Sequence, residues 1–179
     1  MPALKIDTVP SCPVTAFIAF GGNLGSCRET FINARDQLSQ RGVVVLVSSP
    51  LYITAAVGGP DGQADYLNAV IQVETCLSAL QLLELCLEVE LEAGRQRNQH
   101  WGPRTLDLDL LLYAQLVCDT PRLMLPHPRL HQRRFVLEPL CTLAGAWHHP
   151  RLHQSFQYLL QQLPMKPSVN LLELQWEFV

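Results

Sequence analysis

The order of apolar segments along the chain constrains its fold more than any other feature of the sequence. Strand patterns lie at 14–20, 43–52, 66–74 and 106–113, and helical patterns lie at 26–41 and 78–94. A strand, helix, strand, strand, helix, strand order is typical of the ferredoxin-like βαββαβ sandwich, in which two helices cover one face of an antiparallel sheet. The sequence therefore predicts an α+β, ferredoxin-like fold with C-terminal additions after residue 113.

Local signals set several boundaries within this pattern. Ser26, with Glu29 three positions later, has the capping-box spacing that begins a helix. Pro50 interrupts the second strand pattern and predicts an edge or a bulge there. The stretch 54–65 is rich in glycine and proline, so it predicts a long surface loop of the kind that is often functional, and 155–163 predicts a short helix.

Length and composition favour one compact domain. The chain has 179 residues, of which 48% are hydrophobic and 16% charged, and a chain of this size can bury a single core. Residues 1–13 contain three prolines and show no periodicity. We therefore expect a flexible N-terminal extension over 1–13, followed by a single domain over 14–179.

The charge and the apolar runs exclude several classes of protein. A net charge of -3 gives no general attraction to nucleic acid or to anionic membranes, and no apolar run reaches the roughly 20 residues that cross a bilayer. The first twenty residues lack the unbroken apolar stretch of a signal peptide, and the six cysteines show no zinc-ligand spacing. We expect a cytoplasmic monomer with neither nucleic-acid nor membrane partners.

The strand at 106–113 carries two carboxylates at a spacing of two residues. Side chains alternate across a strand, so Asp107 and Asp109 should share one face while Leu106, Leu108 and Leu110 share the other. Two neighbouring like charges need a cation, and Mg²⁺ prefers carboxylate and phosphate oxygens. The alternative is an edge strand whose solvent face happens to be acidic.

Two basic segments flank this strand in the sequence. Three arginines and a histidine lie at 95–104, and a second group of histidines and arginines lies at 126–135. Arginine suits bidentate contact with phosphate, so these segments and the carboxylate pair could clamp a magnesium nucleotide. The chain contains neither a Walker loop nor a kinase glycine loop, and the alternative for 95–104 is a solvated loop after a helix.

A third cluster of histidines lies near the C-terminal end. His148, His149 and His153 have no accompanying cysteine or carboxylate, so we interpret them as exposed loop residues and not as metal ligands.

Four sequence blocks together resemble one known enzyme family. They are GGNLG at 21–25, YITAAVGGPDGQADYLNAV at 52–70, GRQRNQHWGPRTLDLDLLLY at 94–113 and LPHPRLHQRRFVLEPL at 125–140. In order and approximate spacing they resemble 6-hydroxymethyl-7,8-dihydropterin pyrophosphokinase of folate biosynthesis, and the likeness runs from about residue 15 to residue 150. The fold of that family is ferredoxin-like, in agreement with the element order.

The resemblance implies a Mg²⁺-dependent diphosphokinase. Such an enzyme transfers pyrophosphate from ATP, its co-substrate, to the hydroxymethyl group of 6-hydroxymethyl-7,8-dihydropterin and leaves AMP. The residues that match the family's catalytic positions are Arg95, Arg104, Asp107 and Asp109, with both aspartates as ligands of two Mg²⁺ ions. Those that match its ATP contacts are Glu90, Arg97, His100, Trp101, Leu110, His127 and Arg133. Those that match its pterin contacts are Thr54, Val57, Tyr66, Asn68 and Phe135.

The sequence departs from the family pattern at three places. Gly22 stands where a serine is usual, Ala55 and Ala56 stand where a proline is usual, and His100 stands where an arginine is common. The first departure lies in the turn that Gly21-Gly22-Asn23 predicts after the first strand, the second lies in the pterin loop, and the third concerns nucleotide affinity more than the reaction itself.

Two other functions would fit parts of the sequence. A non-catalytic ferredoxin-like module could bind pterin or nucleotide without turnover, although it has no reason to keep two uncompensated carboxylates. A single-stranded RNA binder would need exposed stacking aromatics on central strands and a basic face, whereas the first strand is apolar and the chain is acidic.

Overall fold

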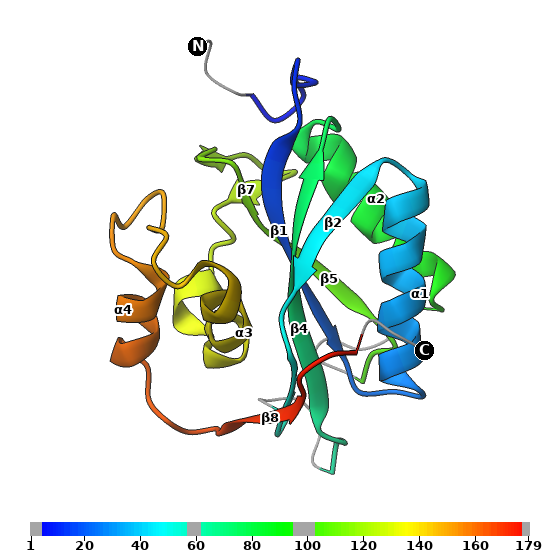
Figure 1. Cartoon of the computed structure of the whole chain (residues 1–179), viewed down its shortest axis with the longest axis vertical. Helices are drawn as coiled ribbons and strands as arrows, with labels where there is room; N and C mark the ends of the chain where they lie inside the picture. The colour runs from blue at the N-terminus through cyan, green and yellow to red at the C-terminus, as the bar shows by residue number, and fades with distance from the viewer. Residues whose placement is uncertain (1–4, 57–61, 95–102, 177–179) are drawn as a thin grey trace.

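A computed structural model of the chain describes residues 5–56, 62–94 and 103–176 (Figure 1). Its first elements are β1 (Val14–Gly22), α1 (Cys27–Gln40), β2 (Val43–Ser48), β3 (Leu51–Thr54), β4 (Tyr66–Thr75), α2 (Ala79–Glu92) and β5 (Asp107–Tyr113). Those that follow are β6 (Cys118–Asp119), β7 (Met124–Leu125), the 3₁₀ helix η1 (Leu130–Gln132), α3 (Arg134–Ala144), α4 (Phe156–Gln162) and β8 (Val169–Glu173). The predicted βαββαβ order is therefore confirmed up to β5.

The main sheet is antiparallel and has β5 at one edge. Its strand order is β5-β1-β4-β3-β8, and β2 also pairs with β4. The two shortest strands, β6 and β7, form a separate small hairpin. β1 and β4, which have the longest pairing, occupy the centre and are almost entirely buried.

The segment predicted as one interrupted strand at 43–52 forms two strands that pair with the same neighbour. β2 pairs with the second half of β4 and β3 with the first half. Pro50, which has no N–H to donate, lies between them. Ser49 keeps this break hydrogen-bonded to β4. Its N–H donates to the Val70 carbonyl at 2.8 Å, and its hydroxyl accepts from the Val70 N–H at 2.9 Å.

The helix starts follow local signals to different degrees. α1 begins directly after Ser26, as predicted, but the Ser26 side chain makes no capping hydrogen bond, so the capping box predicted there is wrong. A complete capping box occurs instead at the start of α2, where Ser78 and Gln81 bond reciprocally. The predicted short helix near residue 155 is confirmed as α4, which Ser155 caps.

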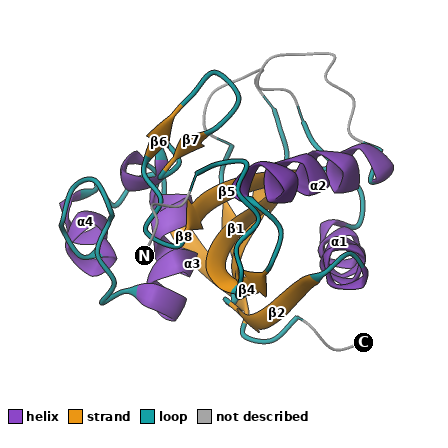
Figure 2. Ribbon diagram, turned by 90° about the horizontal axis from the view of Figure 1, so that it is seen from above, coloured by secondary structure: helices purple, strands orange, loops and turns teal. Residues whose placement is uncertain are grey.

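Helices cover both faces of the sheet. α1 and α2 pack on one face, as the ferredoxin-like order requires, while α3 and α4 pack on the other (Figure 2). α3 has no counterpart among the predicted elements, because its Pro139 and its arginine-rich start give no helical signal in the sequence. The C-terminal additions are therefore the second helical layer of the molecule.

The last strand closes the far edge of the sheet. β8 pairs with β3, and its Glu173 carboxylate accepts two hydrogen bonds from the Arg28 guanidinium of α1 at 3.0 and 3.2 Å. Trp176 is fully buried beside Phe20 and Phe31, and its indole N–H donates to the Ser49 carbonyl. Within the described part of the chain, no helix has both the length and the apolar character needed to span a membrane.

Candidate active site

A cavity of about 700 Å³ lies on the α3 face of the sheet, at the end where β1 finishes and β5 begins, and it extends around the β5 edge to α2. Its walls come from β1, β3, β4, β5, α2, the β6–β7 hairpin, the segment around η1 and the start of α3, and the segment 163–169. The cavity therefore gathers side chains from both halves of the chain. All four of the sequence blocks contribute residues to its lining, and the block at 21–25 contributes only Gly21.

The two aspartates of β5 lie on the cavity side of that strand. In register, Asp107 faces Gly21 and Asp109 faces Ala19 on β1, and both carboxylates line the cavity. The alternate residues, Leu108 and Leu110, are buried in the core under α1 and α2 and also border the cavity. The predicted placement of both carboxylates on one face is confirmed.

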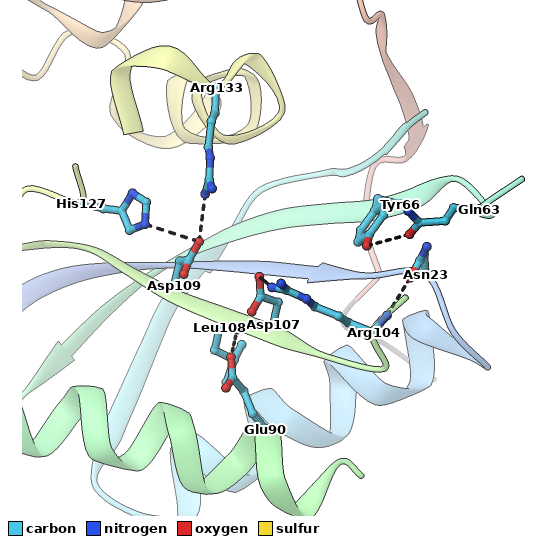
Figure 3. A network of polar contacts seen from close by, with 10 residues as sticks. All are labelled: Asn23, Gln63, Tyr66, Glu90, Arg104, Asp107, Leu108, Asp109, His127 and Arg133. Atoms are coloured by element: carbon cyan, nitrogen blue, oxygen red, sulfur yellow. Dashed lines mark hydrogen bonds and ion pairs between the residues drawn. The ribbon is translucent and has the colours of Figure 1, made fainter. Parts of the chain in front are cut away.

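Each carboxylate has an arginine from a different segment beside it (Figure 3). Arg104 donates to Asp107 at 2.7 Å, and Arg133, at the start of α3, donates to Asp109 at 3.2 Å. His127 places its Nε2 3.7 Å from the same Asp109 carboxylate. Burial lowers the pKa of His127, and the Asp109 charge offsets only part of that effect, so the imidazole is neutral at neutral pH.

Glu90 reaches β5 from the opposite side, from helix α2 (Figure 3). Its side chain is only 2% exposed, and one carboxylate oxygen accepts the Leu108 N–H at 2.6 Å. A buried carboxylate is tolerated when hydrogen bonds replace its hydration. Glu90 thus fixes the backbone of an edge strand midway between the two aspartates.

A second group of residues forms the end of the cavity near β3 and β4. Asn68 donates from its amide to the Thr54 hydroxyl at 3.0 Å and to the Tyr66 carbonyl at 3.2 Å, and both Asn68 and Thr54 are buried. Tyr66 and Phe135 line the same space, and the Arg133 guanidinium lies 5.6 Å from the Phe135 ring centre. Burial raises the pKa of Tyr66, which keeps its phenol neutral at neutral pH.

The structure brings most of the predicted site residues together. The residues that line the cavity are Thr54, Tyr66, Asn68, Glu90, Arg104, Asp107, Asp109, Leu110, His127, Arg133 and Phe135. The remaining five, Val57, Arg95, Arg97, His100 and Trp101, lie outside the described residues.

Several cavity residues carry no prediction from the sequence. Arg122 and Lys166 line the cavity from segments without a recognisable motif. Arg129 and Gln132 also line it, and although neither is predicted individually, both lie inside the basic segment 126–135 that the sequence predicts to contact a nucleotide.

The interpretation of the C-terminal histidines as exposed is wrong for one of the three. His148 and His153 are exposed, but His149 is only 3% exposed. Its ring packs edge-on against His131 and Phe156, and its Nδ1 accepts the backbone N–H groups of Arg151 and Leu152. Burial, together with the nearby His131 and Arg151, lowers the pKa of His149 to about 4.

The carboxylate pair fits a magnesium ion that is shared with a phosphate. Mg²⁺ usually takes one or two protein carboxylates and completes its shell with water and substrate phosphates. Asp107 and Asp109 offer two partly exposed carboxylates toward one cavity. Among the described residues, no cluster of three or more histidine, cysteine, aspartate or glutamate side chains could hold an ion by itself.

Comparison with known proteins finds similar sequences in one enzyme family. A model of the family 7,8-dihydro-6-hydroxymethylpterin-pyrophosphokinase matches residues 17–145. The 2-amino-4-hydroxy-6-hydroxymethyldihydropteridine pyrophosphokinase of Bacillus subtilis is 42% identical over 130 residues, which are 72% of this chain and 77% of that protein. The Haemophilus influenzae protein of the same name is 42% identical over 132 residues, which are 74% of this chain and 82% of that protein.

Solved structures show the same fold at low sequence identity. The Plasmodium falciparum protein HPPK-DHPS superposes with a TM-score of 0.68 at 11% identity, over 88% of this chain. This chain spans 44% of the length of that larger chain. The match over 17–145 and the two relatives of similar length show that the chain belongs to the 7,8-dihydro-6-hydroxymethylpterin-pyrophosphokinase family.

Proposed function

We propose that this protein transfers the terminal diphosphate of ATP to the hydroxymethyl group of 6-hydroxymethyl-7,8-dihydropterin in folate biosynthesis. The hydroxymethyl oxygen forms a bond to the β phosphorus, the bond from that phosphorus to the α–β bridging oxygen breaks, and AMP leaves. The hydroxyl proton passes to solvent. One observation carries the proposal: the carboxylates of Asp107 and Asp109 open into the same cavity as the polar and aromatic residues around Asn68.

Asp107 and Asp109 would hold the Mg²⁺ ions on the phosphate side, two ions in the family resemblance. When bound, Mg²⁺ would neutralise charge on the phosphate oxygens. Arg104 and Arg133 lie against these same carboxylates and line the cavity, so their guanidinium groups are in place to turn to phosphate oxygens. The residues therefore supply positive charge around a triphosphate from two directions.

The pterin would occupy the end of the cavity near Tyr66 and Phe135. A flat heterocycle gains from stacking against aromatic rings, and both rings line this space. The buried Asn68 and Thr54 offer amide and hydroxyl groups to its polar edge. A site that hydrogen-bonds the edge of a substrate rejects analogues that lack those groups.

The adenosine side of ATP would lie at the apolar end of the cavity. Side chains of α2, β5 and the β6–β7 hairpin line that end, namely Leu83, Leu87, Leu110, Leu123 and Met124. Leu87 and Met124 remain 39% and 48% exposed, so this apolar surface is open to a ligand.

Catalysis in such a site depends on position and charge. Phosphoryl transfer requires little covalent chemistry from the protein, and the arrangement asks for aligned reactants and stabilised phosphate oxygens. His127, neutral beside Asp109, has no required role as a strong base in this scheme.

An assay of the products tests this proposal. The purified protein, with ATP, Mg²⁺ and 6-hydroxymethyl-7,8-dihydropterin, should form AMP and the pterin diphosphate in equal amounts, and both can be separated and quantified by liquid chromatography. Formation of ADP would contradict transfer of two phosphates. Saturable binding of both ligands without AMP would favour the non-catalytic module.

A further inference from the structure

A short turn after β1 lies between the two ends of the proposed active site. Asn23 occupies this turn, and its side chain is buried, with the residue only 8% exposed. In the sequence this position signals a turn and no more. In the structure its side-chain amide contacts two segments that are far from it in the chain. Figure 3 shows the contact with Arg104.

The first contact is with the backbone of Arg104. The Asn23 side-chain oxygen accepts the Arg104 N–H at 2.8 Å, while the Arg104 carbonyl accepts the backbone N–H groups of Asn23 and Leu24 at 2.8 and 3.1 Å. Both peptide groups of Arg104 are therefore fixed by this one turn. The Arg104 guanidinium then extends from that fixed backbone to Asp107.

The second contact is with the segment that leads into β4. The Asn23 amide nitrogen donates to the Ala64 carbonyl at 3.1 Å. Ala64 precedes Tyr66 by two residues, and Tyr66 begins the strand that carries Asn68. The two ends of one planar amide thus join the phosphate side of the cavity to its pterin side.

A separate observation shows how closely this turn fits the segment at 104–105. A Cβ atom on Gly22 would lie 2.7 Å from the Thr105 carbonyl oxygen, closer than real Cβ contacts allow. Because the obstacle is backbone, any larger residue at position 22 must move the chain next to Arg104. The turn therefore sets the position of Arg104 by close packing as well as by hydrogen bonds.

We propose that Asn23 is a positioning residue, which holds Arg104 and the start of β4 at the separation that the transfer requires. Asn23 does not contact the reacting groups in this scheme, and the inference rests on the proposed function. Its physical basis is that a displacement of about 1 Å between reactants can cost about 10²-fold in rate. Asparagine suits the role because it has an acceptor and a donor on one rigid group.

Two substitutions separate the halves of this role. Asn23→Asp keeps an acceptor for the Arg104 N–H but places a carboxylate oxygen against the Ala64 carbonyl, whereas Asn23→Ala removes both contacts. We expect Asn23→Asp to raise the KM for the pterin about tenfold and to leave the KM for ATP within about twofold. Asn23→Ala should also lower kcat, by about tenfold or more, because Arg104 loses its fixed position.

Steady-state kinetics with both substrates varied, and thermal unfolding of each variant, make the test. Asn33→Asp is the matched control, since Asn33 is exposed on α1, which contributes no residue to the cavity lining, and its kinetic constants should equal those of the wild type. If the wild type forms no AMP, the proposed function fails. If the wild type is active and both Asn23 variants keep its constants, or lose activity only in proportion to their unfolded fraction, the positioning role is wrong.

Discussion

The two faces of β5 differ in function, because one packs in the core and the other presents charge to the cavity. Toward α1 and α2 the strand presents Leu108 and Leu110, each 3% exposed, to a continuous apolar core. Toward α3 it presents Asp107 and Asp109, whose side chains remain 25% and 33% exposed, to the cavity. The leucines of this strand thus contribute stability, and the aspartates contribute charge. Substitutions on one face should mainly change the free energy of unfolding, and those on the other should mainly change turnover.

The neighbouring strand β1 explains why the α3 face opens into a cavity. Along that face its residues become smaller toward the site, from Phe17 to Ala19 to Gly21. Phe17 and Ala19 belong to the core under α3 and α4, and in register Ala19 and Gly21 lie beside the two aspartates. The cavity begins where the apolar side chains of this face end.

Removing a charge on the cavity face should give the largest effect. Asp107→Asn and Asp109→Asn should each lower turnover by about 10³-fold or more. Each variant removes a carboxylate that binds Mg²⁺, so the phosphate charge is no longer neutralised. Their free energies of unfolding should change by less than about 1 kcal/mol, since both carboxylates are partly exposed. Product assays and urea denaturation measure the two quantities, and near-normal turnover in either variant would remove its metal role.

A substitution on the opposite face of the same strand should lower stability and leave turnover nearly unchanged. Leu108→Ala leaves a cavity in the α1/α2 core and should lower the free energy of unfolding by about 2–4 kcal/mol. Leu108 belongs to this core and also borders the cavity, but it brings no charge to it, so the kcat of the folded fraction should stay within about threefold of the wild type. A large fall in kcat without loss of stability would mean that the two faces are not separable.

The α3 side differs from the α1/α2 side in that its stability should depend on pH through His149. Its pKa is lowered to about 4 in the folded protein, below the unfolded value near 6.5, so the unfolded state takes up the proton first as the pH falls. We expect a loss of about 2 kcal/mol between pH 7 and pH 5 from this group. In urea denaturation at both pH values, His149→Gln should show a smaller loss than the wild type, and an equal loss would contradict this assignment.

Filling the space beside the carboxylates should give the smallest of these effects. A Cβ atom on Gly21 would meet only the Asp107 Cβ, at 3.8 Å, so Gly21→Val should fold. Its methyl groups would narrow the cavity and lower turnover by about tenfold, with no loss of stability. Gly21→Ala serves as the control and should lie between the valine variant and the wild type.

Local patterns predict part of this site, and long-range contacts determine the rest. The common face of Asp107 and Asp109 follows from strand alternation alone, so no tertiary information is needed for it. Arg104 lies only three residues before Asp107, whereas the pairing of Arg133 with Asp109 depends on how α3 docks on the sheet. No spacing rule in the sequence contains that information.

The unpredicted elements have the same origin. β8 is five residues long, and its Val169 pairs with Thr54, which is more than a hundred residues earlier in the chain. α3 includes Pro139 and is stabilised by burial against β1 and β4 more than by its own helical propensity. Asn23 signals a turn in the sequence, but its partners Ala64 and Arg104 become neighbours only in the fold.

The central claim is that Asp107 and Asp109 bind Mg²⁺ together with the phosphates of ATP. Calorimetric titration of a non-hydrolysable ATP analogue, with and without Mg²⁺, into the wild type and into Asp109→Asn tests it most directly. We predict that Mg²⁺ strengthens binding of the analogue to the wild type by about tenfold or more, and that this gain largely disappears in the variant. An equal gain in both proteins would contradict the claim.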